Sequence, residues 1–301
     1  MDLTSETLKR FRVAPGAAVR LTEWDTSWEP KSGEERLSRQ ELKQQAADFV
    51  ANCIQQLAGL QELLWADSRY SVLLIFQGAD TSGKDSTIKH VTSGMNPAAM
   101  RVVSFKEPSL DELKRNYLWR YIAALPEQGY IGVFNRSYYE EVGVVRVNPE
   151  LLKTRAMPQR PPDDAFWAER YEDINSLERQ IVRNGTVIVK FFLHISKGQQ
   201  KRQLLERLQD PTKHWKFSPA DLTARERWHD YQAAYETMLS NTSTDWAPWW
   251  IMPADHRWAM RALVAQVMLN EMRKLDLRYP PVDDERRELI RLAIKKLKSE
   301  K

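Results

Sequence analysis

The sequence predicts an α/β fold, with a five-stranded and mostly parallel sheet covered by helices on both faces. Short apolar segments recur along the chain, at 72–76, 101–105, 129–134, 186–193 and 249–252. Sequence with helical spacing separates them. Continuous apolar runs are typical of parallel strands buried on both faces, and their alternation with helices favours a parallel sheet. Ligands of such sheets bind beyond the carboxyl ends of the strands.

Several predicted helices begin at recognisable caps. Ser38 and Glu41 form the S-x-x-E pattern of a capping box, and helical spacing of apolar residues continues to about residue 65. Ser109 and Glu112 begin another helix of this kind, which we expect to continue to Ile122. The other expected helices cover about 84–94, 164–183, 197–209, a segment that begins at 218, 255–275 and 284–298.

The chain divides into an arm and one domain. Residues 1–37 show no hydrophobic period, and we expect an extended arm that Trp24 and Trp28 anchor to the core. Residues 38–301 have the length of a single α/β domain. Their last helix, 284–298, is basic and amphipathic. We expect it to dock on the core, with another subunit as the alternative partner.

Composition excludes several classes of protein. The 301 residues are 42% hydrophobic with a mean hydropathy of -0.58, and no run approaches the roughly 18 apolar residues of a membrane helix. The first residues lack the apolar core of a signal peptide, so we expect a cytoplasmic protein. Cys53 is the only cysteine, which excludes an internal disulfide and a cysteine zinc site.

Positive charge is concentrated late in the chain. The net charge is only +4, but residues 197–227 hold eight Lys or Arg against four acids. Such a surplus indicates a polyanionic partner, namely nucleotide phosphates, a phosphate polymer or nucleic acid, although a solvated helical face has the same appearance. Because the segment lies between the fourth and fifth strands, we expect a lid that closes over phosphates.

The segment VLLIFQGADTSGKDSTIKH, at 72–90, predicts a phosphate-binding loop between the first strand and a helix. Gly78, Gly83 and Lys84 match the pattern G-x-x-x-x-G-K-[ST]. In this pattern the glycines let backbone N–H groups converge on an anion, and the start of the helix adds partial positive charge. The lysine supplies a full charge.

The loop departs from this pattern in two ways. Asp85 occupies the Ser/Thr position, so the hydroxyl groups of Ser86 and Thr87 arrive one and two residues late. Asp80 also places a carboxylate inside the loop. An acid beside phosphates is useful when a metal ion bridges the two. A glycine-containing strand-to-helix turn without a ligand is the alternative interpretation.

The third strand ends in a second polar cluster. Asn135 and Arg136 follow the apolar run, and Glu140 comes shortly after them. Phosphate-loop enzymes usually place a Mg²⁺-ordering Asp at this edge, whereas Asn135 carries no charge. Arg136 suits bidentate contact with phosphate. A strand end with helix-capping residues is the alternative interpretation.

Together the two clusters predict phosphoryl transfer, which requires positioning and neutralisation of charge rather than a protein nucleophile. The five histidines are scattered and suggest no metal site. Two alternatives remain at this point. One is an ATP-dependent nucleotide or nucleoside kinase of the same fold. The other is a nucleic-acid binder that uses residues 197–227, for which we find no base-reading motif.

Several segments resemble the family-2 polyphosphate kinases in the expected order, over about residues 40–275. The resemblance implies a P-loop kinase-like, three-layer fold similar to thymidylate kinase. It also implies direct transfer between inorganic polyphosphate and a nucleotide, with Mg²⁺ or Mn²⁺ as cofactor. The segments are GADTSGKDSTIKHVTSGMNP (78–97), SFKEPS (104–109), FNRSYYEEV (134–142), FFLHISKGQQKRQLLERLQDPTKHWKFSPAD (191–221) and APWWIMPAD (247–255).

Carried over by position, the resemblance implies a role for each candidate residue. Asp80, Lys84 and Arg136 are expected to be catalytic, with Asp80 holding the metal ion. Asp80, Asn135 and Glu140 are expected to bind the nucleotide. The residues expected to bind phosphate or polyphosphate are Gly78, Ser82, Gly83, Lys84, Asp85, Ser86, Thr87, Arg136, Arg202, Arg207, Lys213 and Lys216.

Asn135 also bears on the acceptor. Many members of the family have Asp at this position, and the form Asn-Arg-Ser-Tyr-Tyr-Glu at 135–140 resembles the branch that accepts both nucleoside mono- and diphosphates. The expected acceptors are AMP and ADP, with ATP as a product and guanine nucleotides as further candidates. Nucleic acid and membranes are not expected partners. Because members of the family often self-associate, we expect a homo-oligomer.

Overall fold

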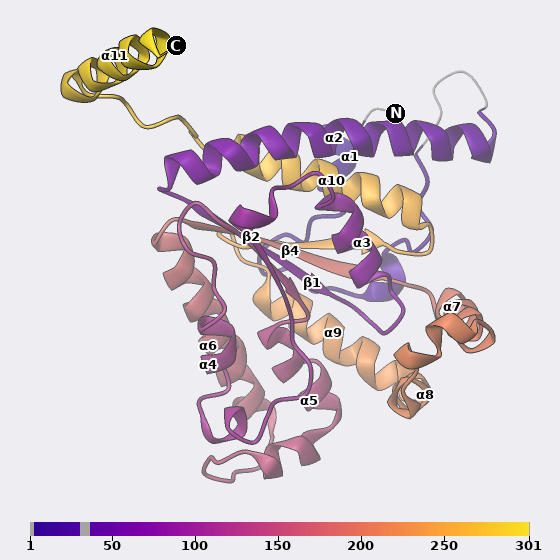
Figure 1. The fold of residues 1–301 in the computed structure, drawn as a ribbon. Helices are drawn as coiled ribbons and strands as arrows, with labels where there is room; N and C mark the ends of the chain where they lie inside the picture. The colour runs from indigo at the N-terminus through magenta and orange to yellow at the C-terminus, as the bar shows by residue number, and fades with distance from the viewer. Residues whose placement is uncertain (1–2, 31–36, 301) are drawn as a thin grey trace.

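A computed structural model describes residues 3–30 and 37–300, and its centre is one parallel sheet (Figure 1). Every ladder of this sheet is parallel, and the strand order is β2-β3-β1-β4-β5. The predicted α/β fold is therefore confirmed. The strands are β1 (Ser71–Gln77), β2 (Met100–Ser104), β3 (Ile131–Asn135), β4 (Thr186–His194) and β5 (Trp249–Pro253).

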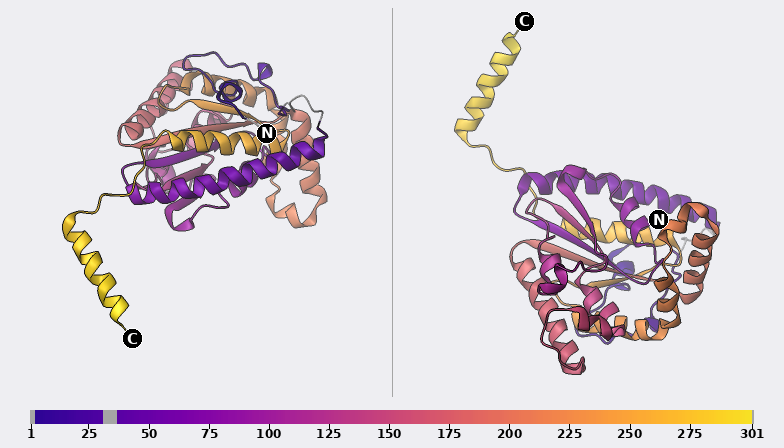
Figure 2. Two further views of the ribbon diagram at one scale, coloured as in Figure 1. Left: turned by 90° about the horizontal axis from the view of Figure 1, so that it is seen from above. Right: turned by 60° about the horizontal axis from the view of Figure 1, so that its bottom comes forward.

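Helices cover both faces of the sheet and give three layers (Figures 1 and 2). Alternate residues of β1 point to opposite faces, so Leu74 joins one core cluster and Leu73 the other. The first face is covered by α2 (Arg39–Asp67), α3 (Lys84–Val91) and α10 (Arg257–Arg273). The second is covered by α4 (Trp119–Ile122), α5 (Val144–Val147), α6 (Asp164–Arg183) and α9 (Trp228–Thr242).

The helix caps confirm one prediction and correct another. Ser38 and Glu41 form the expected capping box of α2. Ser109 and Glu112 also exchange the expected hydrogen bonds, but the long helix predicted to follow them is wrong. Only a 3-10 turn, η3 (Glu112–Lys114), and the short α4 form there. The side chain of Asn116 accepts a hydrogen bond from the N–H of Leu118 at 2.8 Å, and such local bonds compete with helix formation.

The described part of the arm, residues 3–30, runs along the outer strand β5 and contributes to both cores. It includes the short helix α1 (Ser5–Lys9). The N–H of Val13 donates to the carbonyl oxygen of Trp249 at 2.9 Å, and the N–H of Ile251 donates to that of Phe11 at 2.8 Å. Trp28 packs edge-on against Phe11 as an anchor. Residues 31–36 of the predicted arm lie outside the described residues.

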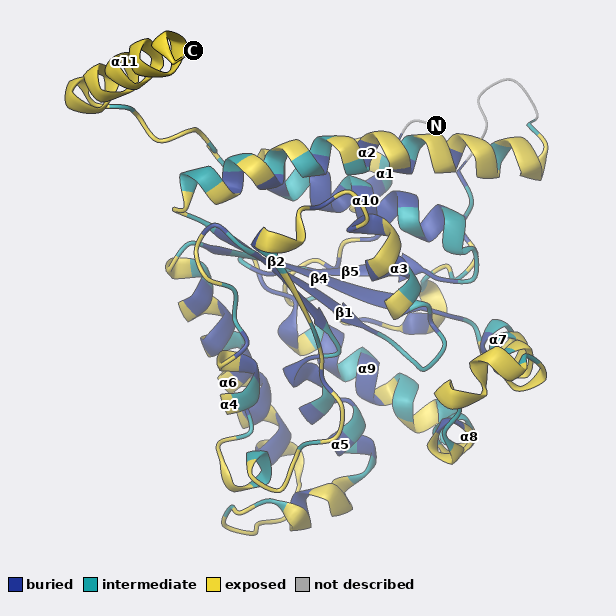
Figure 3. Cartoon of the chain, in the orientation of Figure 1, coloured by how far each residue is buried: buried dark blue, intermediate teal, exposed yellow. Residues whose placement is uncertain are grey.

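Two parts of the chain project from this body (Figures 1 and 2). Helices α7 (Lys197–Gln209) and α8 (Pro219–Glu226), which lie in the segment predicted to be a lid, are placed beyond the carboxyl edge of the sheet. The terminal helix α11 (Asp284–Ser299) is exposed along its whole length (Figure 3), so the expectation that it docks on its own core is wrong. Within the described residues, no helix combines the length and apolar character needed to span a bilayer.

Candidate active site

The loop after β1 has a backbone shape that requires glycine. Gly78 has φ 141°, and a Cβ atom there would lie 2.6 Å from the carbonyl oxygen of Leu193 at the end of β4. Gly83 has φ 97° and caps α3, which begins at Lys84 as predicted. Thr81 also adopts a positive φ of 64°, which costs free energy for a residue with a side chain. The loop is thus held in a curved shape against the neighbouring strand.

Four buried polar atoms around this loop have no hydrogen-bond partner among the described residues. Buried polar groups are nearly always paired, so an unpaired cluster indicates a ligand with donors and acceptors of its own. Thr87 and Ser82 are residues that the sequence assigned to phosphate binding. The atoms are Gln77 Oε1, Thr81 Oγ1, Ser82 Oγ and Thr87 Oγ1.

Lys84 is buried beside the loop, with only 8% of its surface exposed. Its Nζ donates to the carbonyl oxygens of Gly78 and Ala79 at 2.7 and 3.1 Å. Burial, and then the charge of Arg136, lower the pKa of Lys84 to about 8. The lysine is therefore a cation that gains strongly from an approaching anion.

Arg136 joins the third strand to the loop. The residue directly follows β3 with a positive φ of 64°, and its N–H donates to the carbonyl oxygen of Phe76 at 3.1 Å. Its guanidinium donates to Asp80 Oδ1 at 2.7 Å and to Glu140 Oε2 at 3.1 Å. The charges of Glu140 and Asp80 raise the pKa of Arg136. The two predicted clusters thus form one site.

Gln77 and Asn135 complete the polar rim. Gln77 Nε2 donates to Glu140 Oε1 at 3.1 Å. Asn135 Nδ2 donates to Asp85 Oδ1 at 2.7 Å and to Ser104 Oγ at 3.3 Å. The side chains of three adjacent strands therefore meet at the carboxyl edge of the sheet. The sequence analysis did not identify Gln77 and Ser104 as site residues, although both lie at strand ends.

The lid residues lie in different surroundings. Lys216 Nζ approaches Asp85 Oδ2 to 3.9 Å. In the described chain, this is the one ion pair between the four predicted lid cations and the loop. Arg207 donates to Asp221 Oδ2 at 2.8 Å and ties α7 to α8. Arg202 contacts Gln199 of its own helix, and Lys213 pairs with Asp210 at 2.7 Å. The structure therefore does not bring Arg202 or Lys213 to the loop.

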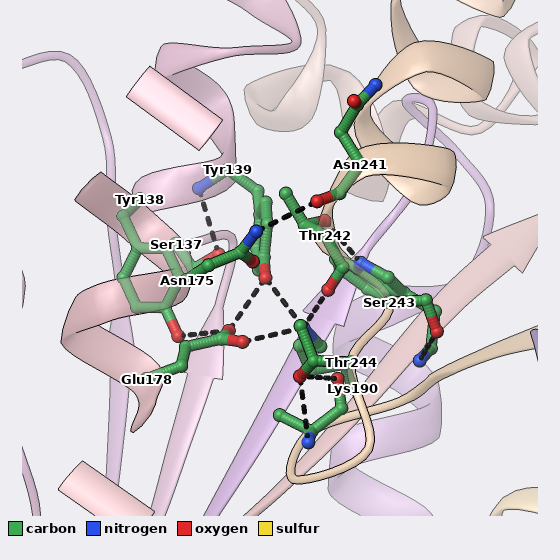
Figure 4. Close-up of polar contacts among 12 residues, drawn as sticks. Ser137, Tyr138, Tyr139, Asn175, Glu178, Lys190, Asn241, Thr242, Ser243 and Thr244 are labelled. Carbon is green, nitrogen blue, oxygen red and sulfur yellow. Dashed lines mark hydrogen bonds and ion pairs between the residues drawn. The ribbon is translucent and has the colours of Figure 1, made fainter. Parts of the chain in front are cut away.

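A buried ion pair supports the segment that follows Arg136 (Figure 4). Lys190 Nζ donates to Glu178 Oε2 at 2.7 Å, and both side chains are fully buried. The hydroxyls of Tyr138 and Tyr139 donate to Glu178 Oε1 at 2.8 and 2.7 Å, while Lys190 also donates to the Thr242 carbonyl oxygen at 2.7 Å. This network escaped the sequence analysis, although a lysine within an apolar strand was a signal for it.

A second buried cluster lies on the same segment. Glu141 accepts hydrogen bonds from Arg170 at 2.9 Å and from Arg155. Burial raises the pKa of Glu141, and the two arginines oppose this effect. Both clusters involve residues within five positions of Arg136. Their buried charged contacts therefore hold the segment that follows Arg136 in place.

The residues of this site suit a magnesium ion that is bound partly by the phosphates of the substrate. Among residues 3–30 and 37–300, no three His, Cys, Asp or Glu side chains are gathered as a metal cage. Mg²⁺ is usually bound by one or two carboxylates together with substrate phosphates. Asp80, with 29% of its side chain exposed beside the unpaired hydroxyls, suits that mode.

Comparison with known proteins agrees with this geometry. Residues 36–279 match the family model "Polyphosphate kinase 2 (PPK2)". An ADP-polyphosphate phosphotransferase of Rhodopseudomonas palustris is 45% identical over 292 residues, covering 96% of this chain and 98% of that protein. An AMP/ADP-polyphosphate phosphotransferase of Meiothermus ruber is 39% identical over 273 residues, covering 91% and 96%.

A solved structure shows the same fold. The crystal structure of polyphosphate kinase 2 from Arthrobacter aurescens superposes with a TM-score of 0.83 at 35% identity, and the match covers 95% of each chain. The family match spans most of the sequence, and the curated relatives match nearly end to end. The chain therefore belongs to the polyphosphate kinase 2 family.

Proposed function

We propose that this protein transfers a phosphoryl group directly between inorganic polyphosphate and nucleoside mono- and diphosphates, converting AMP to ADP and ADP to ATP. The observation that carries the proposal is the contact of Arg136 with both Asp80 and Glu140 beside the unpaired hydroxyls of the phosphate loop. Both substrates are polyanions, and such a site relieves their mutual repulsion.

Each group has a part in this reaction. Phosphate is held by the N–H groups of the loop, by Lys84 and by Thr87. Arg136 neutralises the charge of the phosphoryl group during its transfer and orients it. Asp80 and Glu140 fix the arginine and face the nucleotide. Bound Mg²⁺ or Mn²⁺, held by Asp80 and substrate phosphates, supplies further neutralisation of charge.

The neutral Asn135 supports a broad choice of acceptor. Its amide donates to Asp85 and Ser104 without adding a further negative charge at the end of β3, so a nucleotide with either one or two phosphates meets less repulsion there than beside an Asp at position 135. Relatives carry names that specify ADP, AMP/ADP and GDP as acceptors. We therefore include guanine nucleotides as candidate substrates.

A chromatographic assay with purified protein, Mg²⁺ and polyphosphate tests this function. AMP should yield ADP and then ATP, and ADP should yield ATP. Product from ADP alone would keep the reaction and reject the interpretation of Asn135. ATP acting as sole donor to a nucleotide or nucleoside, with polyphosphate inert, would support the rival ATP-dependent kinase instead. A phosphorylated side chain that turns over competently would contradict direct transfer.

We also propose that residues 38–301 work as one cytoplasmic catalytic domain, with residues 1–37 as an arm and 197–227 as a lid. The bond between Arg207 and Asp221 lets α7 and α8 move together. Burial, and then the charge of Asp80, raise the pKa of Asp221. This coupling supports a lid that responds to the charge of the site.

The exposed helix α11 supports self-association. Five of its apolar side chains are between 46% and 65% exposed, namely Leu289, Ile290, Leu292, Ile294 and Leu297. We propose that this face packs on a second copy of the chain in a homo-oligomer. Light scattering should show a smaller assembly after removal of residues 280–301. If the shortened protein contains the same number of subunits per assembly as the full chain, this role of α11 is rejected.

The pKa of Lys84 predicts how donor binding responds to pH. With a pKa of about 8 in the free protein, Lys84 loses its charge as pH rises through that value. The KM for polyphosphate should therefore rise above about pH 8. The folded protein binds fewer protons than the unfolded chain between about pH 8 and the ordinary lysine pKa of 10.5, so the stability of the free protein rises with pH across that window, as the buried charge is lost.

The matched control for this prediction is Lys84→Arg, because arginine keeps its charge over the whole range. Initial rates at several polyphosphate concentrations between pH 7 and 10, with ADP saturating, would provide the KM values. The rise should be absent in the variant. An equal rise in both proteins would show that another group titrates.

A further inference from the structure

Two arginines lie near the start of α10, and the first of them approaches the phosphate loop. Arg257 and Arg261 are one turn apart, which places them on the same face of the helix. The Nε of Arg257 lies 3.9 Å from the position that a Cβ atom would take at Gly83. At least one guanidinium therefore stands next to the loop, in addition to Arg136.

This arginine pair has no acidic partner in the part of the chain that the structure describes. Among residues 3–30 and 37–300, neither guanidinium forms an ion pair with a carboxylate, and Arg257 donates instead to the side-chain oxygen of Gln203 on α7. The Nε of Arg261 is buried and has no hydrogen-bond partner among the described residues. Burial, and then the charge of Arg257, lower the pKa of Arg261. The two cations repel each other, and nothing described in the protein offsets this.

Three other buried or half-buried arginines near the site or its supporting cluster do have a carboxylate partner. Arg136 pairs with Asp80, Arg170 with Glu141, and Arg207 with Asp221. A guanidinium that serves packing alone is expected to find a carboxylate in the same way. The two arginines of α10 therefore remain available for an anion that comes from outside the protein.

We propose that Arg257 and Arg261 bind the part of the polyphosphate chain that is not being transferred, and guide it away from the loop between α10 and α7. This assignment rests on the proposed function. Polyphosphate carries about one charge per phosphate, so it presents a row of anions at a spacing that consecutive guanidinium groups can contact. The bond from Arg257 to Gln203 places the lid helix α7 beside this path.

The test is the double variant Arg257→Gln/Arg261→Gln, with Arg273→Gln at the other end of α10 as matched control. Donor kinetics are measured with long-chain polyphosphate and with tripolyphosphate, and nucleotide kinetics with ADP. Binding of long-chain polyphosphate without nucleotide is measured at several salt concentrations. The conservative pair Arg257→Lys/Arg261→Lys retains the charge.

We expect the KM for long-chain polyphosphate to rise by about tenfold for each arginine removed. The KM for ADP and the melting temperature should remain unchanged. The KM for tripolyphosphate should be affected much less, because only two phosphates of that donor belong to the part that is not transferred. The salt dependence of binding should weaken by roughly one unit of log–log slope for each lost phosphate contact. The lysine pair should recover part of the affinity.

Wild-type binding and salt dependence in the glutamine variant would overturn the proposal. So would an equal loss for tripolyphosphate and long chains, because the arginines would then act at the transferred phosphate or through the fold. If the wild-type protein binds polyphosphate but transfers nothing, the proposed function fails, and the binding measurement still decides whether the arginines hold the polymer.

Discussion

Replacement of Asp80 by alanine should lower kcat for transfer from polyphosphate to ADP by about a thousandfold. Asp80 is the acid inside the loop, and its Oδ1 receives the guanidinium of Arg136 at 2.7 Å. Without it, Glu140 is the one carboxylate left to Arg136 among the described residues, and the proposed metal ion loses its protein ligand. The measurement is the initial rate at saturating polyphosphate and ADP.

Two further variants sharpen this test. Asp80→Asn preserves a hydrogen-bond acceptor for Arg136 but removes the charge, so a loss close to that of alanine would assign the effect to charge. Asp111→Ala removes the acid of an exposed acid–arginine pair, with Arg115 at 3.3 Å, and should leave the rate unchanged. Near-normal turnover in Asp80→Ala, at any Mg²⁺ concentration, would contradict the role given to Asp80.

Replacement of Lys190 by methionine should lower the free energy of unfolding by about 3–5 kcal/mol. The methionine fills similar volume, but Glu178 is left as a buried carboxylate with only the hydroxyls of Tyr138 and Tyr139 as donors. An uncompensated buried charge is among the costliest defects in a protein interior. Urea denaturation at neutral pH, followed by tryptophan fluorescence, measures the change.

The double variant Lys190→Met/Glu178→Gln is the matched control. Its neutral amide oxygen still accepts from Tyr138 and Tyr139, so most of the lost stability should return. Because Tyr138 directly follows Arg136 and Ser137, the single variant should also show a lower kcat at temperatures where it remains folded. If the single and double variants are equally stable, the unpaired charge of Glu178 does not cause the loss of stability.

The parts of the site that lie in one continuous segment could be predicted from the sequence. The loop from Gly78 to Thr87 depends on glycine conformations and a helix start, both of which are local. The capping box at Ser38 is local in the same sense. The prediction of a long helix after Ser109 was wrong because the side chain of Asn116 accepts a hydrogen bond from the backbone, and this bond competes with the helix.

The parts that depend on the order of strands could not be predicted. Asn135 meets Asp85 and Ser104 only because β3 lies between β2 and β1, and an α/β pattern permits other orders. The ion pair of Lys190 and Glu178 requires that α6 pack on β4 in one register. Arg257 reaches Gly83 because α10 lies beside α3, two elements far apart in the sequence.

The pairing of the arm with β5 has a consequence for how the chain folds during synthesis. Phe11 and Val13 find their hydrogen-bond partners in residues 249–251, so they leave the ribosome long before those partners exist. Contacts with such large sequence separation form slowly, because a long loop must close first. The two cores that the arm helps to seal can therefore be completed only after β5 has been made.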